Sequence, residues 1–150
     1  MWIKGYARSI RYANSITAEF WALRDGLKLA LNEGIQRLVV ELDAKVVVDL
    51  IKSNAATNKL YAPLLYDCRG LLTRFIQVQV VHVYTEGNRC ADALTRWGSN
   101  MAEAFAVFDS PPSLDVVYLV NMDSVGMFVN RIAELDLNFT MRWSVICISP

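Results

Sequence analysis

Three acidic residues, Glu19, Asp43 and Asp92, occupy positions where the side chains of an α/β protein can meet and do chemistry. We expect Glu19 in the first turn of a helix, Asp43 at the carboxyl end of a strand, and Asp92 in the first turn of a helix that follows a strand. Because such positions share one edge of an open sheet, the carboxylates can converge there. Carboxylate oxygens are the ligands that Mg²⁺ and Mn²⁺ prefer, and two such ions about 4 Å apart can support phosphodiester cleavage.

Each of these acids also has a purely structural explanation. An acid in the first turn of a helix complements the helix dipole, which would account for Glu19 and Asp92 without a metal. An acid at the end of a strand often caps the next helix, which would account for Asp43. Spacing alone therefore does not decide between a metal site and these structural roles.

The hydrophobic pattern predicts the elements that must position these acids. Apolar residues cluster as in buried strands, or recur at the three- and four-residue spacing of helices. The predicted elements are a strand at 2–10, a helix at 17–32, a strand at 37–42, a short helix at 46–51, a helix at 59–75, a strand at 76–84, and a helix at 89–106 that is interrupted or ends near Gly98. Gly34 suits the left-handed position after its helix. This order indicates an α/β fold with a parallel pair formed by 37–42 and 77–84.

The composition favours a soluble intracellular protein with one main domain. With 150 residues, of which 54% are hydrophobic and 20% charged, the chain can bury a core. Cys68, Cys90 and Cys147 lie far apart without CxxC spacing, which favours reduced thiols over a disulfide framework or a zinc site. No apolar run reaches the roughly 18 residues of a membrane span, so no membrane association is expected. The sequence does not distinguish the nucleus from the cytoplasm.

The charged residues are unevenly distributed although the formal net charge is +0. Residues 1–99 contain 13 Lys and Arg against 9 Asp and Glu, whereas residues 100–150 contain 2 against 6. A basic body with an acidic tail is compatible with a phosphate-binding face, and equally with ordinary solvated charge.

Three ordered motifs resemble a known family. The strings SITAEFWALRDGLKLAL, LVVELDAKVVVDLI and VVHVYTEGNRCADALTRWG are similar to the plant retroelement-derived branch of the ribonuclease H-like family. The residues that match its pattern are Ala18-Glu19, Ala22-Leu23, Asp43, Glu86-Gly87-Asn88 and Ala91-Asp92. The string FDSPPSLDVVYLVNMDSVG resembles the tail that commonly follows this domain. The resemblance divides the chain into a ribonuclease H-like domain at 2–106, a tail at 107–130 that docks on it through a short helix and loop, and an unassigned extension at 131–150.

The resemblance implies hydrolysis of the RNA strand in RNA–DNA hybrids by two divalent ions, Mg²⁺ or Mn²⁺, held by four carboxylates. Glu19, Asp43 and Asp92 would be the second, third and fourth of these. Asn88 would order its loop or contact nucleic acid. Arg89 and Arg96 would contact phosphates, unless they are ordinary solvated arginines.

The chain departs from the family in its first strands and first acid. The family's sheet order is 3-2-1-4-5, and residues 2–10 correspond to its third strand, so an incomplete mixed sheet with helices packed on it is expected. The absent first Asp ordinarily bridges both metals, so we expect a weakened site and no cleavage by this chain alone. The strand at 37–42 then exposes a pairing edge, which either 2–10 or the apolar segment 143–148 closes, or through which the chain self-associates.

Other catalytic interpretations have weaker support. His82 lies within the strand pattern, so we interpret it as a satisfied strand residue rather than a catalytic one. Cys90 is interpreted as a helix-packing residue. The sequence has no GxGxxG, GxxxxGK or GxSxG motif. The alternatives to a nuclease are a non-enzymatic module that binds nucleic acid or protein, and a retroelement remnant with no selected function.

Overall fold

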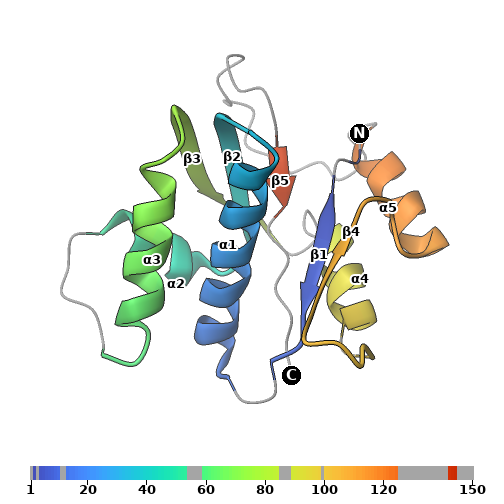
Figure 1. The fold of residues 1–150 in the computed structure, drawn as a ribbon, viewed down its shortest axis with the longest axis horizontal. Helices are drawn as coiled ribbons and strands as arrows, with labels where there is room; N and C mark the ends of the chain where they lie inside the picture. Colours follow the sequence, from blue (N-terminus) through green and yellow to red (C-terminus); the bar gives the residue numbers. More distant parts are fainter. Residues whose placement is uncertain are drawn as a thin grey trace.

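The computed structural model describes residues 2, 4–10, 13–53, 59–84, 89–98, 100–124 and 142–144. Helices and short strands alternate within these residues, as expected for an α/β protein. The elements are β1 (Gly5–Arg8), α1 (Ser15–Asn32), β2 (Arg37–Leu42), α2 (Lys45–Lys52), α3 (Ala62–Leu72), β3 (Gln77–His82), α4 (Arg89–Gly98), β4 (Phe105–Phe108), α5 (Leu114–Ser124) and β5 (Arg142–Ser144). Figure 1 shows α1 and α3 alongside the β2–β3 sheet, and α4 and α5 beside β1 and β4.

The first sheet has the order β3-β2-β5 and is parallel throughout. Strands β2 and β3 pair from Arg37 opposite Gln77 to Leu42 opposite His82, so the predicted parallel pair is confirmed. On the other edge, β2 pairs with β5, which contains the first two residues of the predicted closing segment 143–148. Residues 145–148 lie outside the described part. Self-association through this edge of β2 was expected only if the edge stayed unpaired, and β5 pairs with it.

The second sheet consists of β1 and β4, which pair antiparallel from Gly5 opposite Phe108 to Arg8 opposite Phe105. The predicted end of the helix near Gly98 is confirmed, because α4 spans Arg89–Gly98. The prediction that a helix could continue to 106 was wrong, because the apolar run at 105–108 forms β4. Residues 2–10 therefore have a partner, although it is not the edge of β2.

Helix α1 starts and stops at residues with suitable chemistry. The Asn14 side chain accepts a hydrogen bond from the Thr17 amide at 2.8 Å and caps the first turn. Beyond the helix, Gly34 takes a φ of 72°, the left-handed conformation predicted for it. The cap sets the helix start at Ser15, two residues before the predicted start at Thr17, which changes the position of Glu19 within the helix.

Two apolar clusters of unequal size hold the fold together. The larger one joins α1, α2, α3, β2 and β3 and includes Phe20, Leu27, Val40 and Leu65. The smaller one consists of Ala91, Leu94 and Val116, with Trp2, Ala93, Phe108 and Val120 packed around it. The smaller cluster joins α4 to α5, which spans Leu114–Ser124. Residues 125–130 of the predicted tail lie outside the described part.

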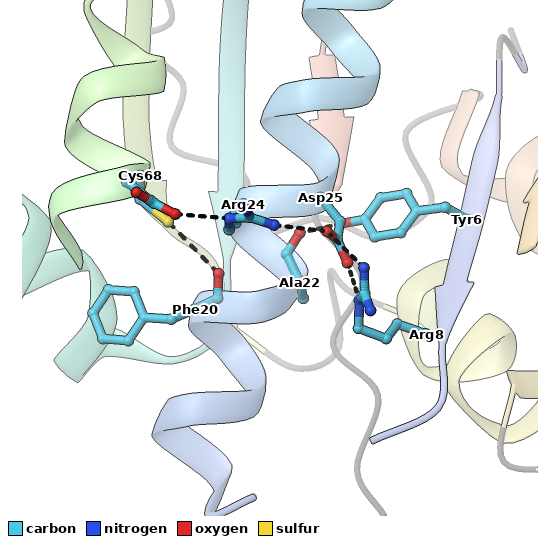
Figure 2. Close-up of polar contacts among 8 residues, drawn as sticks. Tyr6, Arg8, Phe20, Ala22, Arg24, Asp25 and Cys68 are labelled. Carbon is cyan, nitrogen blue, oxygen red and sulfur yellow. Dashed lines mark hydrogen bonds and ion pairs between the residues drawn. The ribbon is translucent and has the colours of Figure 1, made fainter. Parts of the chain in front are cut away.

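Polar contacts attach β1 and α3 to opposite sides of α1 (Figure 2). From β1, the Tyr6 hydroxyl donates to the Ala22 carbonyl at 2.5 Å, and Arg8 forms a two-bond ion pair with the buried carboxylate of Asp25. From α3, Asp67 accepts a hydrogen bond from Arg24 at 3.0 Å. The Tyr6 and Arg8 contacts hold β1 against α1, and the Asp67 contact holds α3 against α1. Within the described ranges, no helix has both the length and the apolar character needed to cross a bilayer.

Candidate functional site

Asp43 follows the last residue of β2 at the carboxyl edge of the parallel sheet, as predicted. The ends of β2 and β3 are joined there, because the Val83 amide donates to the Leu42 carbonyl at 2.8 Å. The predicted alternative that Asp43 caps the next helix is wrong. Ala44 is the N-cap residue of α2, and no side chain caps that helix. The position of Asp43 is thus set by the strand end, and its carboxylate has no capping role.

His82 fixes the backbone at this edge. Its Nε2 lies 3.1 Å from the Asp43 carbonyl oxygen, a contact in which the imidazole N–H donates. The ring also packs edge-on against Tyr84, with centroids 5.4 Å apart. His82 is the half-buried last residue of β3, so its interpretation as a satisfied strand residue is confirmed.

Asp92 lies in the first turn of α4, as predicted, and faces the charge of Asp43. Burial raises the pKa of the Asp92 carboxyl, the negative charge of Asp43 raises this pKa further, and the positive charge of Arg96 lowers it. Burial and the negative charge of Asp43 both disfavour ionisation of Asp92, and a divalent cation near the two carboxylates would relieve this. We refer to Asp43 and Asp92 as the carboxylate pair.

Glu19 is placed differently from the prediction. Because α1 begins at Ser15, Glu19 falls in the second turn, and no acid lies in the first turn to complement the helix dipole. The residue is half-buried, and its Oε2 atom is buried. Within the described residues, no group of three or more His, Cys, Asp and Glu side chains is arranged to hold a metal ion. Asp43 and Asp92 are therefore the carboxylates that could hold a divalent ion, and the described residues do not form a complete metal site.

An open groove of about 700 Å³ adjoins the carboxylate pair. Its lining comes from α4 and from the start of α5, and includes Arg89, Asp92, Arg96, Trp97, Ser113 and Asp115. Arg89 and Arg96 are solvent-exposed and lie on the same side of α4 as Asp92, since they are three and four residues away from it. Both arginines of the predicted nucleic-acid set therefore border one groove. Asn88, the third member, lies outside the described residues.

The sequence did not point to Trp97, Ser113 or Asp115 as groove residues. Trp97 lies four residues after Ala93, which also lines the groove, so the two share one side of α4. Ser113 and Asp115 belong to the tail, where Ser113 accepts a hydrogen bond from the Val116 amide at 3.3 Å and caps α5. Ser113 and Asp115 line the groove only because α5 packs against α4.

Comparisons with known proteins agree with the motifs. Residues 2–98 match the model of the family described as reverse transcriptase-like. Over 125 residues the chain is 30% identical to a protein of Arabidopsis thaliana named "Putative ribonuclease H protein", which covers 83% of this chain and 20% of that protein. Over 81 residues it is 36% identical to a protein of Enterococcus faecalis named "Putative hydrolase EbsB", which covers 53% of this chain and 60% of that protein. The chain thus spans about a fifth of the length of the plant relative. No solved structure is significantly similar to it.

Proposed function

The chain belongs to the reverse transcriptase-like family, and on this basis we propose that it is a ribonuclease H-like domain that binds RNA–DNA hybrids or other nucleic acid. Its similarity to the Arabidopsis protein supports a ribonuclease H-like identity. We also place it in the plant retroelement-derived branch, on the ordered motifs around Glu19, Asp43 and Asp92.

We further propose that Asp43 and Asp92 form half of a divalent metal site. The observation that carries this proposal is the placement of Asp43 at the carboxyl edge of the parallel sheet and of Asp92 in the first turn of α4, close enough for the charge of Asp43 to raise the pKa of Asp92. Mg²⁺ or Mn²⁺ bound there would neutralise the phosphodiester and activate a water for attack. The chain's own residues hold Asp43 at a fixed strand end, orient Asp92 at the start of α4, and present Arg89 and Arg96 to phosphates.

Cleavage by this chain alone is not expected. The described residues bring two carboxylates together, whereas the family's chemistry implies four. A weakened site binds its ions less tightly and controls their geometry poorly. Nucleic-acid binding without efficient hydrolysis is therefore the function that the geometry supports best.

The first test is the binding of a fluorescently labelled RNA–DNA hybrid, measured by anisotropy in Mn²⁺ and in EDTA. We expect Mn²⁺ to tighten binding by the unmodified chain, and we expect Asp43→Asn and Asp92→Asn each to lose this effect, because either substitution leaves only one anionic ligand. A loss of at least tenfold in Mn²⁺ affinity is expected for each. Glu19→Gln tests whether the third acid of the family joins the pair when the ion is bound.

Asp49→Asn is the matched control, because Asp49 is an exposed acid of α2 that pairs with Lys45 at 2.7 Å. It should leave the Mn²⁺ effect unchanged. If the unmodified chain binds the hybrid with the same affinity in Mn²⁺ and in EDTA, the metal half-site is contradicted. Hybrid cleavage on a denaturing gel, lost in Asp43→Asn, would contradict the expected inactivity.

A further inference from the structure

The groove between α4 and α5 extends beyond the carboxylate pair and has chemistry that the metal does not use. We propose that it binds single-stranded nucleic acid, with Trp97 as a stacking platform for one base and with Arg89 and Arg96 as phosphate contacts. This inference rests on the proposed function, since it takes nucleic acid as the ligand, and it adds the type of strand and the residue that recognises it.

Trp97 is suited to this role by its exposure and its support. Its side chain is 38% exposed and lines the groove. Its ring packs against Phe108 of β4, with centroids 4.8 Å apart and planes at 84°. A large ring that is already held in place loses little conformational entropy when a base stacks on it. Base–aromatic stacking accepts any base, because every base has a π face.

The two arginines are spaced for a strand that follows α4. Arg89 and Arg96 are seven residues apart, which corresponds to a rise of about 10 Å along a helix. A stacked strand carries one phosphate per about 3.4 Å of rise, so the arginines are about three nucleotide steps apart. Trp97 follows Arg96 in the chain, so its ring lies at the Arg96 end of this span.

The mixed charge of the lining favours a nucleotide over a purely anionic ligand. Two arginines are balanced by Asp92 and Asp115 in the same groove. A bare phosphate or an acidic peptide gains little from such a balance, because attraction and repulsion nearly cancel. A nucleotide adds a flat apolar base that Trp97 can cover. In a duplex the bases are already stacked on one another, so a tryptophan platform is used by a single strand.

The test compares two oligonucleotides with the same number of phosphates, one of deoxyadenylate and one abasic, in EDTA so that no metal contributes. We expect Trp97→Leu to weaken deoxyadenylate binding about tenfold and to leave abasic binding unchanged, since only the first ligand stacks. We expect Trp97→Tyr to restore most of the affinity, because it keeps a ring. Arg89→Gln and Arg96→Gln should weaken both ligands.

Trp21→Leu is the matched control. Trp21 lies on α1, where Arg8 and Arg24 cover its ring at 5.1 and 5.2 Å from the centroid, and it does not line the groove. This variant should bind like the unmodified chain. Thermal melts of all variants detect a loss of folding, and the Trp97→Tyr variant keeps the test valid if Trp97→Leu unfolds.

The inference is overturned if Trp97→Leu and Trp97→Tyr both retain full affinity, or if the loss is equal for abasic and deoxyadenylate strands. It is also overturned if an acidic peptide of equal charge binds as tightly as the oligonucleotide. Hybrid binding through Arg89 and Arg96 would then still support the proposed function. If neither a hybrid nor a single strand binds, the proposed function fails as well.

Discussion

At the scale of single residues, the Asp92 carboxyl is less favourable in its charged form than it would be in water. Its raised pKa means that the folded protein holds the proton more tightly than the unfolded chain does. The folded state is therefore penalised as the pH rises from the ordinary value of 3.8 through the raised pKa, and the penalty is complete above it. We therefore expect the charged Asp92 carboxyl to lower the stability of the folded protein at neutral pH when no metal is bound.

We predict that Asp92→Asn raises the free energy of unfolding at pH 7, because it removes a charge that faces burial and the charge of Asp43. The gain should shrink as the pH falls and vanish below the ordinary pKa of an aspartate. Urea denaturation in EDTA across this pH range measures it. An Asn variant that is less stable than the unmodified chain at pH 7 would show that Asp92 is stabilised by a partner instead.

The sequence correctly predicted that Asp43 follows a strand and that Asp92 lies in the first turn of a helix, because local pattern marks both positions. It placed Glu19 one turn too early, since the capping contact of Asn14 moves the start of α1 to Ser15. It did not identify Trp97 as a groove residue, because the groove exists only where α5 packs on α4. Local sequence pattern determines where Asp43 and Asp92 lie in their elements, whereas long-range packing of α5 on α4 determines that Trp97 lines a groove.

At the scale of elements, α1 and β1 approach so closely that one methyl group has no room. A Cβ built on Gly26 would lie 2.8 Å from the Tyr6 hydroxyl, which donates to the Ala22 carbonyl. Gly26→Ala should therefore lower the free energy of unfolding by about 1–3 kcal/mol, since the overpacking outweighs the better helix propensity of Ala.

Gly70 provides a control of opposite sign. It lies in α3, and a Cβ built there meets nothing within 4 Å. Gly70→Ala should raise the free energy of unfolding by about 0.5–1 kcal/mol, because only helix propensity changes. Urea denaturation of both variants measures the pair. Equal effects at the two positions would contradict the close contact between β1 and α1.

The long helices and the β2–β3 pair were predictable because their periodicity is local. The run at 105–108 was not, because four apolar residues fit the end of a helix as well as a strand. What makes it β4 is its pairing with β1, which lies almost the whole domain away in sequence. The sequence predicted that either 2–10 or 143–148 would pair with the edge of β2. It could not choose between them, because the periodicity of a short strand does not identify its partner.

At the scale of the whole molecule, the two members of the carboxylate pair adjoin apolar clusters of unequal size. Asp43 follows β2, which belongs to the larger apolar cluster, whereas Asp92 adjoins Ala91 of the smaller one. A small cluster opens at lower cost than a large one. We therefore expect α4 and α5 to open locally while the larger core stays folded, which would separate the two carboxylates.

We predict that backbone amides of α4 and α5 exchange with deuterium at least tenfold faster than those of α1 and β2. Mn²⁺ that contacts both carboxylates should slow exchange in α4, because it binds only the closed form. Hydrogen exchange followed by mass spectrometry measures both effects. The same protection in all four elements would indicate that the molecule opens as a single unit.

The pairing of β2 with β5 also affects how the protein is made. Val40 lies opposite Trp143, a partner roughly 100 residues later in the chain. During synthesis, β2 leaves the ribosome long before its second neighbour has been translated, and pairings over such distances form slowly. This edge of β2 therefore lacks β5 as a partner until residues 142–144 have been translated, and an unpaired strand edge is a place where a wrong strand can pair.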